Sequence, residues 1–238
     1  MARLANEDLY DRPMREFPLI DRILLKVALG ILWVVSKLMW RWRVEGAERL
    51  RAAGTGSVII CNHTSMAEVV AIMAHLLMTG APTRAIGKSE FFEHPLIAWA
   101  FARAGSIPVK RGSADMGALR AAQHALGRGE NVLIFPEGTR VRTDDQPVEV
   151  HGGYALIAQM GKAPVVPMAV CGFRDITPAG SRVPRPLTCW IRVGGPVSLA
   201  DAPVELSRRE RLAWLEGEGM RRVYEIRDAL RAEHPGRR

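Results

Sequence analysis

Between residues 57 and 170, short apolar runs alternate with helix-like segments, and this alternation constrains the fold more than any other feature of the chain. The apolar runs have the length and the bounding Gly or Pro residues of buried strands, and the segments between them carry apolar residues at helical spacing. The predicted strands are residues 57–61, 83–87, 106–109, 131–135 and 165–170, with a later β-rich piece at 188–195. The predicted helices are residues 66–78, 94–104, 114–129 and 153–161. We therefore expect an α/β fold with a mostly parallel sheet flanked by helices, with ligands bound beyond the carboxyl ends of the strands.

The length of the chain, 238 residues, suits one substantial domain with an appendage. We expect residues 1–43 to form an N-terminal amphipathic helical membrane-binding segment, and residues 44–238 to form the α/β domain. Within that domain, residues 44–56 are interpreted as a connector. The tail from Pro203 to His234, rich in Arg and Glu, predicts a charged surface helix that closes the domain.

The N-terminal apolar segment is interrupted by charges in a way that favours a membrane-surface helix. Only ten uncharged residues separate Lys26 from Lys37, whereas a spanning helix needs about 20 apolar residues. At helical spacing, Arg22, Lys26, Lys37 and Arg41 fall on one side, and apolar residues cover most of the rest. This pattern predicts a helix that lies in the interface at the cytoplasmic face of a membrane, as in a peripheral or monotopic protein. The alternative is an amphipathic helix packed in the core of a soluble protein.

The stretch "CNHTSMAE" places His63 at the end of a predicted strand and Glu68 five positions later. In one interpretation, Ser65 and Glu68 form a capping box that begins the following helix, worth about 1 kcal/mol. In the other, His63 is a general base, and Glu68 accepts its second ring N–H and stabilises the imidazolium that forms. Both can hold at once, because a carboxylate has two oxygens. Cys61 precedes this pair and is interpreted as a buried structural residue rather than a nucleophile.

The stretch "FPEGTR", residues 135–140, follows another predicted strand directly. Pro136 ends the strand, Gly138 permits a tight turn, and Glu137 and Arg140 supply an acceptor and an anion-binding guanidinium. Taken alone, the same residues could form a turn with a surface ion pair. Because His63, Lys88, Arg111 and the residues after Phe135 each follow a predicted strand, we expect them to converge on one crevice.

Four motifs occur in order along the chain: a His with an acid five positions on, "GSIPVKR" at 105–111, "FPEGTR" at 135–140 and "VVPMAV" at 165–170. In this order and spacing they resemble the motif blocks of the glycerolipid acyltransferases typified by 1-acylglycerol-3-phosphate acyltransferase. The resemblance covers about residues 58–170. Its most specific part is "FPEGTR", whereas "GSIPVKR" alone would be a weak indication.

This resemblance implies the transfer of a fatty acyl chain from acyl-CoA or acyl carrier protein to the free hydroxyl of a lysophospholipid, 1-acylglycerol-3-phosphate, giving phosphatidate in phospholipid biosynthesis. By position, His63 would be the catalytic base and Glu68 its orienting acid. The acceptor phosphate would be bound by Lys88, Arg111 and Arg140, and Glu137, Gly138 and Thr139 would shape the acceptor site. The resemblance also implies no metal ion, no cofactor beyond the acyl donor and no covalent enzyme intermediate.

Two positions depart from the family pattern. The usual acid at position 68 is Asp, and this chain has Glu, which is one methylene longer. A misplacement of about 1 Å can cost about 100-fold in rate, but His63, Arg111 and "FPEGTR" are present, so we expect the pair to be retained. At position 151 a lysine is expected and the chain has His151. These departures leave open another lysolipid or glycolipid acceptor.

The charge of the chain favours an anionic partner without identifying it. Lys and Arg number 33 against 25 Asp and Glu, a formal net charge of +8. A non-catalytic membrane-binding protein is an alternative from a different class. The basic residues are spread along the chain without a helix-turn-helix, zinc-finger or aromatic single-strand platform, so we expect no nucleic-acid partner. Three widely spaced cysteines in apolar runs predict neither a disulfide framework nor a zinc site.

Overall fold

The computed structural model describes residues 9–54, 56–110, 115–178, 181 and 183–235. Within these ranges seven strands form one sheet in the order β1, β7, β6, β2, β5, β3, β4. Strands β2 to β6 run parallel to one another, β7 is antiparallel to β6, and β1 is parallel to β7. The strands are β1 (Arg43–Glu45), β2 (Val58–Cys61), β3 (Thr83–Lys88), β4 (Ile107–Val109), β5 (Asn131–Ile134), β6 (Val165–Cys171) and β7 (Trp190–Val193). The predicted mostly parallel α/β sheet is confirmed.

Strand β2 lies at the centre of the sheet between β5 and β6, and it is buried on both faces. Val58 and Ile60 point into one hydrophobic core, and Ile59 and Cys61 point into the other. Because successive strand residues point to opposite faces, an uninterrupted apolar run is what a strand covered by helices on both sides requires.

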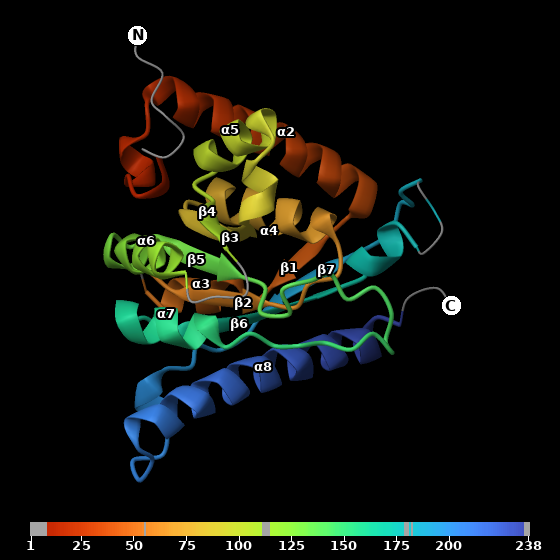
Figure 1. Ribbon diagram of the computed structural model, residues 1–238. Coiled ribbons are helices and arrows are strands. Elements are labelled where there is room, and N and C mark those ends of the chain that lie inside the picture. Colours follow the sequence, from red (N-terminus) through yellow and green to blue (C-terminus); the bar gives the residue numbers. More distant parts are fainter. Residues whose placement is uncertain (1–8, 55, 111–114, 179–180, 182, 236–238) are drawn as a thin grey trace.

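Helices cover both faces of the sheet (Figure 1). Helices α6 (Met116–Gly127), α7 (Gly153–Gly161) and α8 (Arg208–Glu233) contribute to one core, and α4 (Met66–Met78) and α3 (Ala47–Ala52) contribute to the other. Helix α5 (Pro95–Arg103) packs with the 3₁₀ turn η2 (Ser89–Phe92), which contacts β3 and β4. Helix α2 (Leu19–Trp40) packs along α4, on the side of the sheet away from α8. The short 3₁₀ turns are η1 (Met14–Glu16), η3 (Phe173–Ile176) and η4 (Leu199–Asp201).

The interpretation of residues 44–56 as a connector was wrong. Strand β1 begins at Arg43 and pairs with β7, where Val44 lies opposite Ile191. Helix α3 follows it and buries Leu50 in the core shared with α4. Elements of three and six residues are too short to show a periodic pattern, and the pairing partner of β1 lies about 150 residues further along the chain.

The segment before α2 is held to the α/β domain by a buried ion pair. The Nε of Arg84, on β3, donates to Oε2 of Glu130 at 2.6 Å, and the other oxygen of Glu130 accepts the backbone N–H of Met14 at 2.6 Å. The guanidinium of Arg84 also donates to the carbonyls of Tyr10, at 3.0 Å, and of Arg12. The predicted division of the chain at residue 43 stays a prediction, but the residues before α2 are fixed on the sheet domain.

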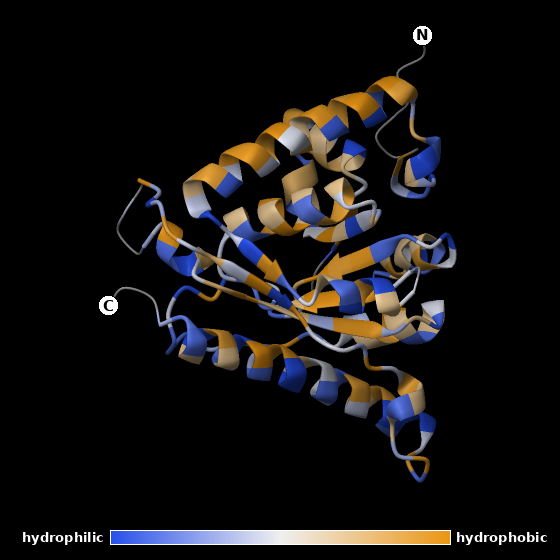
Figure 2. Ribbon diagram, turned by 180° about the vertical axis from the view of Figure 1, so that it is seen from behind, coloured by the Kyte–Doolittle hydropathy of each residue, from blue (hydrophilic) through white to orange (hydrophobic). Residues whose placement is uncertain are grey.

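Helix α2 is attached to the domain along one side and exposed along another. The Nε of Arg103 donates to Oδ1 of Asp21 at 2.9 Å, and Ser36 accepts a hydrogen bond from the buried indole of Trp42 at 3.0 Å. The opposite side exposes an apolar surface, most strongly at Leu38, which is 75% exposed, and Figure 2 shows the helix as mostly hydrophobic. Its 22 residues are long and apolar enough to cross a membrane by length and composition. The position of α2 in the membrane interface stays a prediction.

Candidate active site

His63 lies in the loop between the end of β2 and the start of α4, at the carboxyl edge of the sheet. Its Nδ1 lies 2.7 Å from Oε1 of Glu68. The Glu68 side chain is fully buried, whereas the His63 side chain is 14% exposed. A buried carboxylate beside a partly accessible imidazole is the arrangement that a general base requires.

Glu68 forms both the contact with His63 and the helix cap, so the two predicted sets of contacts coexist, and the role of His63 as a general base stays a prediction. Its Oε1 accepts from His63 and from the backbone N–H of Thr64 at 2.6 Å. Its Oε2 accepts from the Thr64 hydroxyl at 2.5 Å and from the backbone N–H of Ser65 at 3.0 Å. Ser65 in turn caps α4 by accepting from Ala67 N at 3.2 Å. The N-terminal end of α4 further favours the negative charge.

The contacts of the imidazole fix its orientation. Because the Glu68 oxygen is an acceptor, Nδ1 must carry the hydrogen, which leaves Nε2 able to accept a proton. The ring lies on the ring of Phe135, with centroids 4.5 Å apart. His63 also lines a cavity, so it can meet a substrate that enters there.

This cavity has a volume of about 660 Å³ and is lined mainly by apolar side chains, within the roughly 300–1,000 Å³ of small-molecule sites. Its walls come from α2, α4 and α5, together with the ends of β3 and β5. His63, Lys88, Lys110 and His151 all line this cavity, as do the carboxylates of Asp21 and Asp115. The apolar lining suits a hydrocarbon chain, and the basic side chains suit an anionic group.

The loop after β5, which contains "FPEGTR", forms two hydrogen bonds with the backbone of His63. Oε2 of Glu137 accepts the backbone N–H of His63 at 2.7 Å, and the N–H of Val141 donates to the carbonyl of His63 at 2.8 Å. Glu137 is buried, and burial is the main cause that raises its pKa. Gly138 has a φ of +62°, a conformation that glycine adopts without strain, and lines the cavity. Thr139 is exposed.

The basic residues predicted to converge do so only in part. Lys88 and His63 both line the cavity, and Lys88 forms an ion pair with Glu90 at 3.1 Å. Arg140 is exposed, and it is not one of the described residues that line the cavity. Arg111 lies outside the described residues. Phosphate binding by these three residues stays a prediction.

Several residues near the dyad had no predicted role. Thr64 binds both oxygens of Glu68, and the cap pattern around Ser65 could have drawn attention to it. Tyr224, on α8, donates to Oε1 of Glu137 at 3.2 Å, a contact across 87 positions of the chain that no local pattern indicates. Lys110, next to the predicted Arg111, lines the cavity.

Cys61 is a buried structural residue, as predicted. The residue has no exposed surface, and its Sγ lies 3.9 Å from the side-chain oxygen of Asn62. Burial, followed by the nearby carboxylates of Glu68 and Glu137, raises the pKa of the thiol well above its usual value. A thiol held protonated in this way is a poor nucleophile.

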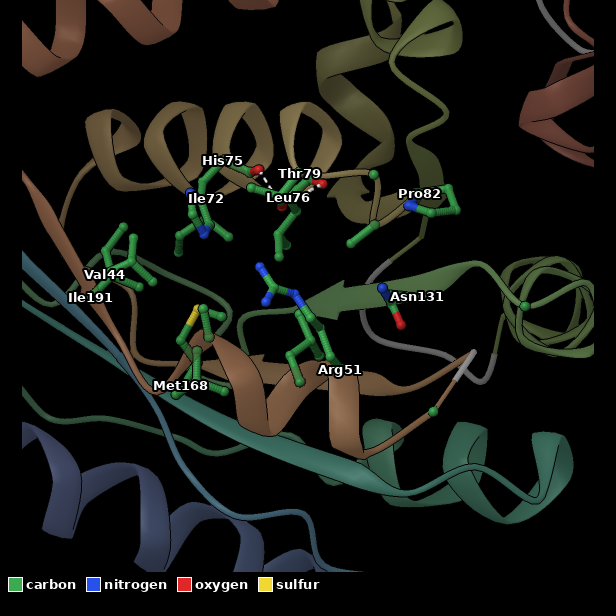
Figure 3. Close-up of a pocket in the computed structure, with 17 residues that line it drawn as sticks. Val44, Arg51, Ile72, His75, Leu76, Thr79, Pro82, Asn131, Met168 and Ile191 are labelled. Carbon is green, nitrogen blue, oxygen red and sulfur yellow. Dashed lines mark hydrogen bonds between the residues drawn. The ribbon is translucent and has the colours of Figure 1, made fainter.

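A second cavity, of about 370 Å³, lies between α3 and α4 (Figure 3). Figure 3 shows the Arg51 side chain reaching from α3 into this space toward α4. His75 also lines it, with its ring 5.9 Å from that of Trp42, and burial lowers the pKa of this imidazole. Of the described residues that line this cavity, none is Asp or Glu, so no histidine–carboxylate pair faces it. The cavity at His63 is therefore the candidate active site.

The fold and the site define an α/β protein with a histidine–carboxylate pair beside an apolar cavity. A family model described as Acyltransferase matches residues 41–171, more than half of the chain. The chain belongs to this acyltransferase family.

Known proteins support this assignment at moderate identity. The chain is 31% identical over 144 residues to 1-acyl-sn-glycerol-3-phosphate acyltransferase LPAT1, chloroplastic, of Arabidopsis thaliana, covering 60% of this chain but 39% of that protein. It is 29% identical to the 1-acyl-sn-glycerol-3-phosphate acyltransferase of Bacillus subtilis, covering 86% of this chain and 98% of that protein. The crystal structure of the 1-acyl-sn-glycerophosphate acyltransferase PlsC from Thermotoga maritima superposes with a TM-score of 0.64 at 23% identity, covering 87% of this chain and 80% of that one. This structural likeness shows the shared fold.

Proposed function

We propose that the protein transfers a fatty acyl chain from an acyl thioester to the free hydroxyl of 1-acylglycerol-3-phosphate and so forms phosphatidate. The observation that carries the proposal is the 2.7 Å contact between a fully buried Glu68 and His63, which lines a mainly apolar cavity. The names of the Arabidopsis and Bacillus relatives support the choice of substrate. Acyl-CoA and acyl carrier protein both supply the thioester that this chemistry needs.

In the proposed reaction, Nε2 of His63 takes the proton of the acceptor hydroxyl while that oxygen attacks the carbonyl carbon of the thioester. A carbon–oxygen bond forms, and the electron pair of the carbonyl moves to its oxygen. When this pair returns, the carbon–sulfur bond breaks, and the imidazolium gives its proton to the leaving thiolate. Glu68 stabilises the imidazolium through Nδ1. General-base catalysis of this kind contributes about 10²- to 10⁴-fold in rate, and the steps use only side chains and the two substrates.

We assign the binding of the acceptor's phosphate to basic residues near His63. Lys88 lines the same cavity as the imidazole, which supports its role. Arg140 follows the loop that holds His63, and its exposed guanidinium could reach an anion at the cavity mouth as a two-pronged donor. We assign Arg111 to the same phosphate site because it ends the "GSIPVKR" motif. Glu137, Gly138 and Thr139 would then shape the loop against which the headgroup lies.

We further propose that the protein works at the cytoplasmic face of a membrane as a peripheral or monotopic enzyme, with α2 in the interface. One side of α2 is bonded to the domain through Asp21 and Ser36, and its exposed side is apolar. A helix held along one side by its own domain can lie flat in the interface while its other side enters the lipid. Because α2 also lines the cavity, a lipid acceptor could enter from the membrane.

Changing Val27 and Ile31 to Glu should weaken binding to anionic vesicles by about 10-fold or more, because two exposed apolar side chains would no longer enter the lipid. Co-sedimentation with phosphatidylglycerol vesicles measures this. Val204→Glu is the matched control, since Val204 is highly exposed near the start of α8, well away from α2. Equal binding by the double variant and the wild type would exclude α2 as the contact with the membrane.

A different lysolipid acceptor is the second candidate. Glu68 stands where the family usually has Asp, and His151, which lines the cavity, stands where a lysine is expected. His151 lies 3.9 Å from Glu149, an exposed carboxylate that is not among the described residues lining the cavity. An acceptor with a zwitterionic or uncharged headgroup would suit a cavity with a histidine in place of this lysine better than a phosphate monoester would.

A panel of acceptors tests the proposal. Purified protein receives one labelled acyl-CoA and, separately, 1-acylglycerol-3-phosphate, a lysophosphatidylcholine, a lyso-ornithine lipid and a monoacylglycerol. We expect the highest kcat/KM with 1-acylglycerol-3-phosphate and labelled phosphatidate as the product. A higher value with another member of the panel would replace the acceptor and keep the reaction, and no transfer to any of them would overturn the proposed function.

A further inference from the structure

Glu137 occupies a buried place between the His63 loop and helix α8. One oxygen accepts the backbone N–H of His63 at 2.7 Å, and the other accepts the hydroxyl of Tyr224 at 3.2 Å. The residue is 4% exposed. With both oxygens engaged inside the protein, Glu137 links α8 to the loop that carries the catalytic base.

The backbone of His63 is held from both sides by residues of the loop after β5. Its N–H is bound by Glu137, and its carbonyl accepts the N–H of Val141 at 2.8 Å. The side chain is held separately, by Glu68 at Nδ1 and by the ring of Phe135. The direction of Nε2 therefore depends on the backbone bonds as well as on the dyad, and Glu137 supplies one of these bonds.

Tyr224 is held in place by α8. It lies on the turn next to Arg227, whose guanidinium carbon is 4.4 Å from the centre of the tyrosine ring. Helix α8 packs along β6 and also contacts β2, the strand that leads into His63. Tyr224 lies beyond residues 41–171, which match the acyltransferase family model, so its contact with Glu137 is additional to the matched segment.

We propose that Tyr224 is a positioning residue for acyl transfer: its hydroxyl fixes Glu137, and Glu137 fixes the backbone of the base His63. The proposal rests on the proposed function for its catalytic meaning. Its structural part, a hydrogen-bonded link from α8 through Glu137 to the amide of His63, can be measured without turnover.

The hydrogen bonds of this link favour the ionised form of Glu137. Burial raises the pKa of Glu137, and the hydrogen bonds from His63 and Tyr224 lower it. Among the described residues, Glu68 raises this pKa and Arg227 lowers it, and the other titratable groups that interact with Glu137 are His63, Tyr224 and the buried thiol of Cys61. Removing the Tyr224 hydroxyl removes a lowering contribution, so Glu137 should bind a proton at a higher pH. A protonated Glu137 is a weaker acceptor for the His63 amide.

Tyr224→Phe tests the proposal, because it keeps the ring and its contact with Arg227 but removes the hydroxyl. We expect kcat to fall about 10-fold, as for the loss of one hydrogen bond to a charged group, with KM for both substrates within about twofold. In a plot of kcat against pH, the fall in kcat on the acid side should occur at a higher pH than in the wild type. Tyr10→Phe is the matched control, because the Tyr10 ring packs on Phe92 near β3 and β4, and this variant should keep the wild-type acid side.

The His63 backbone amide provides the readout that does not depend on activity. Its proton chemical shift, followed by NMR against pH, should titrate with Glu137, and the midpoint should be higher in Tyr224→Phe than in the wild type and in Tyr10→Phe. An unchanged midpoint, or an equal loss of kcat at every pH, would overturn the role of Tyr224. If the wild type transfers no acyl chain, the proposed function fails, but the amide titration still decides whether Tyr224 acts on Glu137.

Discussion

Replacing Glu68 by Gln is expected to lower the turnover number of acyl transfer by about 10²- to 10⁴-fold. Four donors point at the two oxygens of Glu68: the His63 ring N–H, the N–H and hydroxyl of Thr64, and the N–H of Ser65. A Gln presents one oxygen and one amino group. If the amino group faces His63, the ring must take the other tautomer, and Nε2 then carries a hydrogen and accepts no proton. If it faces Ser65, the imidazolium loses the negative charge that stabilises it.

The control for this variant is Glu210→Gln. Glu210 has the same place in a capping box, at the start of α8, where it accepts the N–H of Ser207 at 2.8 Å, but it has no histidine partner. Both variants change a helix cap, but only Glu68→Gln disturbs a buried carboxylate with four donors, and only Glu68→Gln should lose turnover. Glu68→Asp restores the charge and should be faster than Glu68→Gln. Wild-type turnover in Glu68→Gln would show that the dyad has no catalytic role.

Replacing Glu130 by Ala is expected to lower the free energy of unfolding by about 3–5 kcal/mol, because it leaves the charge of Arg84 buried without its partner. Arg84 has no exposed surface, and its Nε lies 2.6 Å from Glu130. The same change removes the acceptor of the Met14 amide, so the segment that leads into α2 should loosen too. Urea unfolding of the purified protein measures the difference.

Glu205→Ala is the comparison for this stability measurement. Glu205 is an exposed carboxylate between η4 and α8, and a surface substitution of this kind is usually within about 0.5 kcal/mol of the wild type. If Glu130→Ala were as stable as Glu205→Ala, the buried pair would not be what fixes the N-terminal segment to the sheet.

The core of the fold could be predicted because its signals are local. The predicted helix 66–78 has the bounds of α4, and the apolar runs at 57–61 and 131–135 became β2 and β5 within one residue at each end. Serine followed three residues later by Glu marked the start of α4, and the spacing of His63 and Glu68, taken with the family motifs, predicted their contact. These patterns are set by neighbours in the chain, so the sequence shows them directly.

The remaining parts depend on contacts between distant segments. Strand β1 exists because β7 pairs with it, and Arg84 is buried in β3 because Glu130 and the backbone of the N-terminal segment surround it. No spacing rule indicates either. The basic residues were expected to meet because each follows a strand, but Arg140 is exposed and is not among the described residues that line the cavity. The position of a residue directly after a strand predicts which loop it belongs to. The conformation of that loop then determines the direction of its side chain, and the sequence does not show this conformation.

Acceptor-dependent release of thiol from an acyl-CoA is the most direct test of the central claim, that His63 activates a lipid hydroxyl for attack on a thioester. Purified wild-type protein, supplied with 1-acylglycerol-3-phosphate, should release free thiol in step with the formation of phosphatidate, and little without the acceptor. His63→Ala should lower this rate by about 10²- to 10⁴-fold, whereas His124→Ala, which changes an exposed histidine on α6, should keep it. Thiol release by His63→Ala at the wild-type rate would contradict the account.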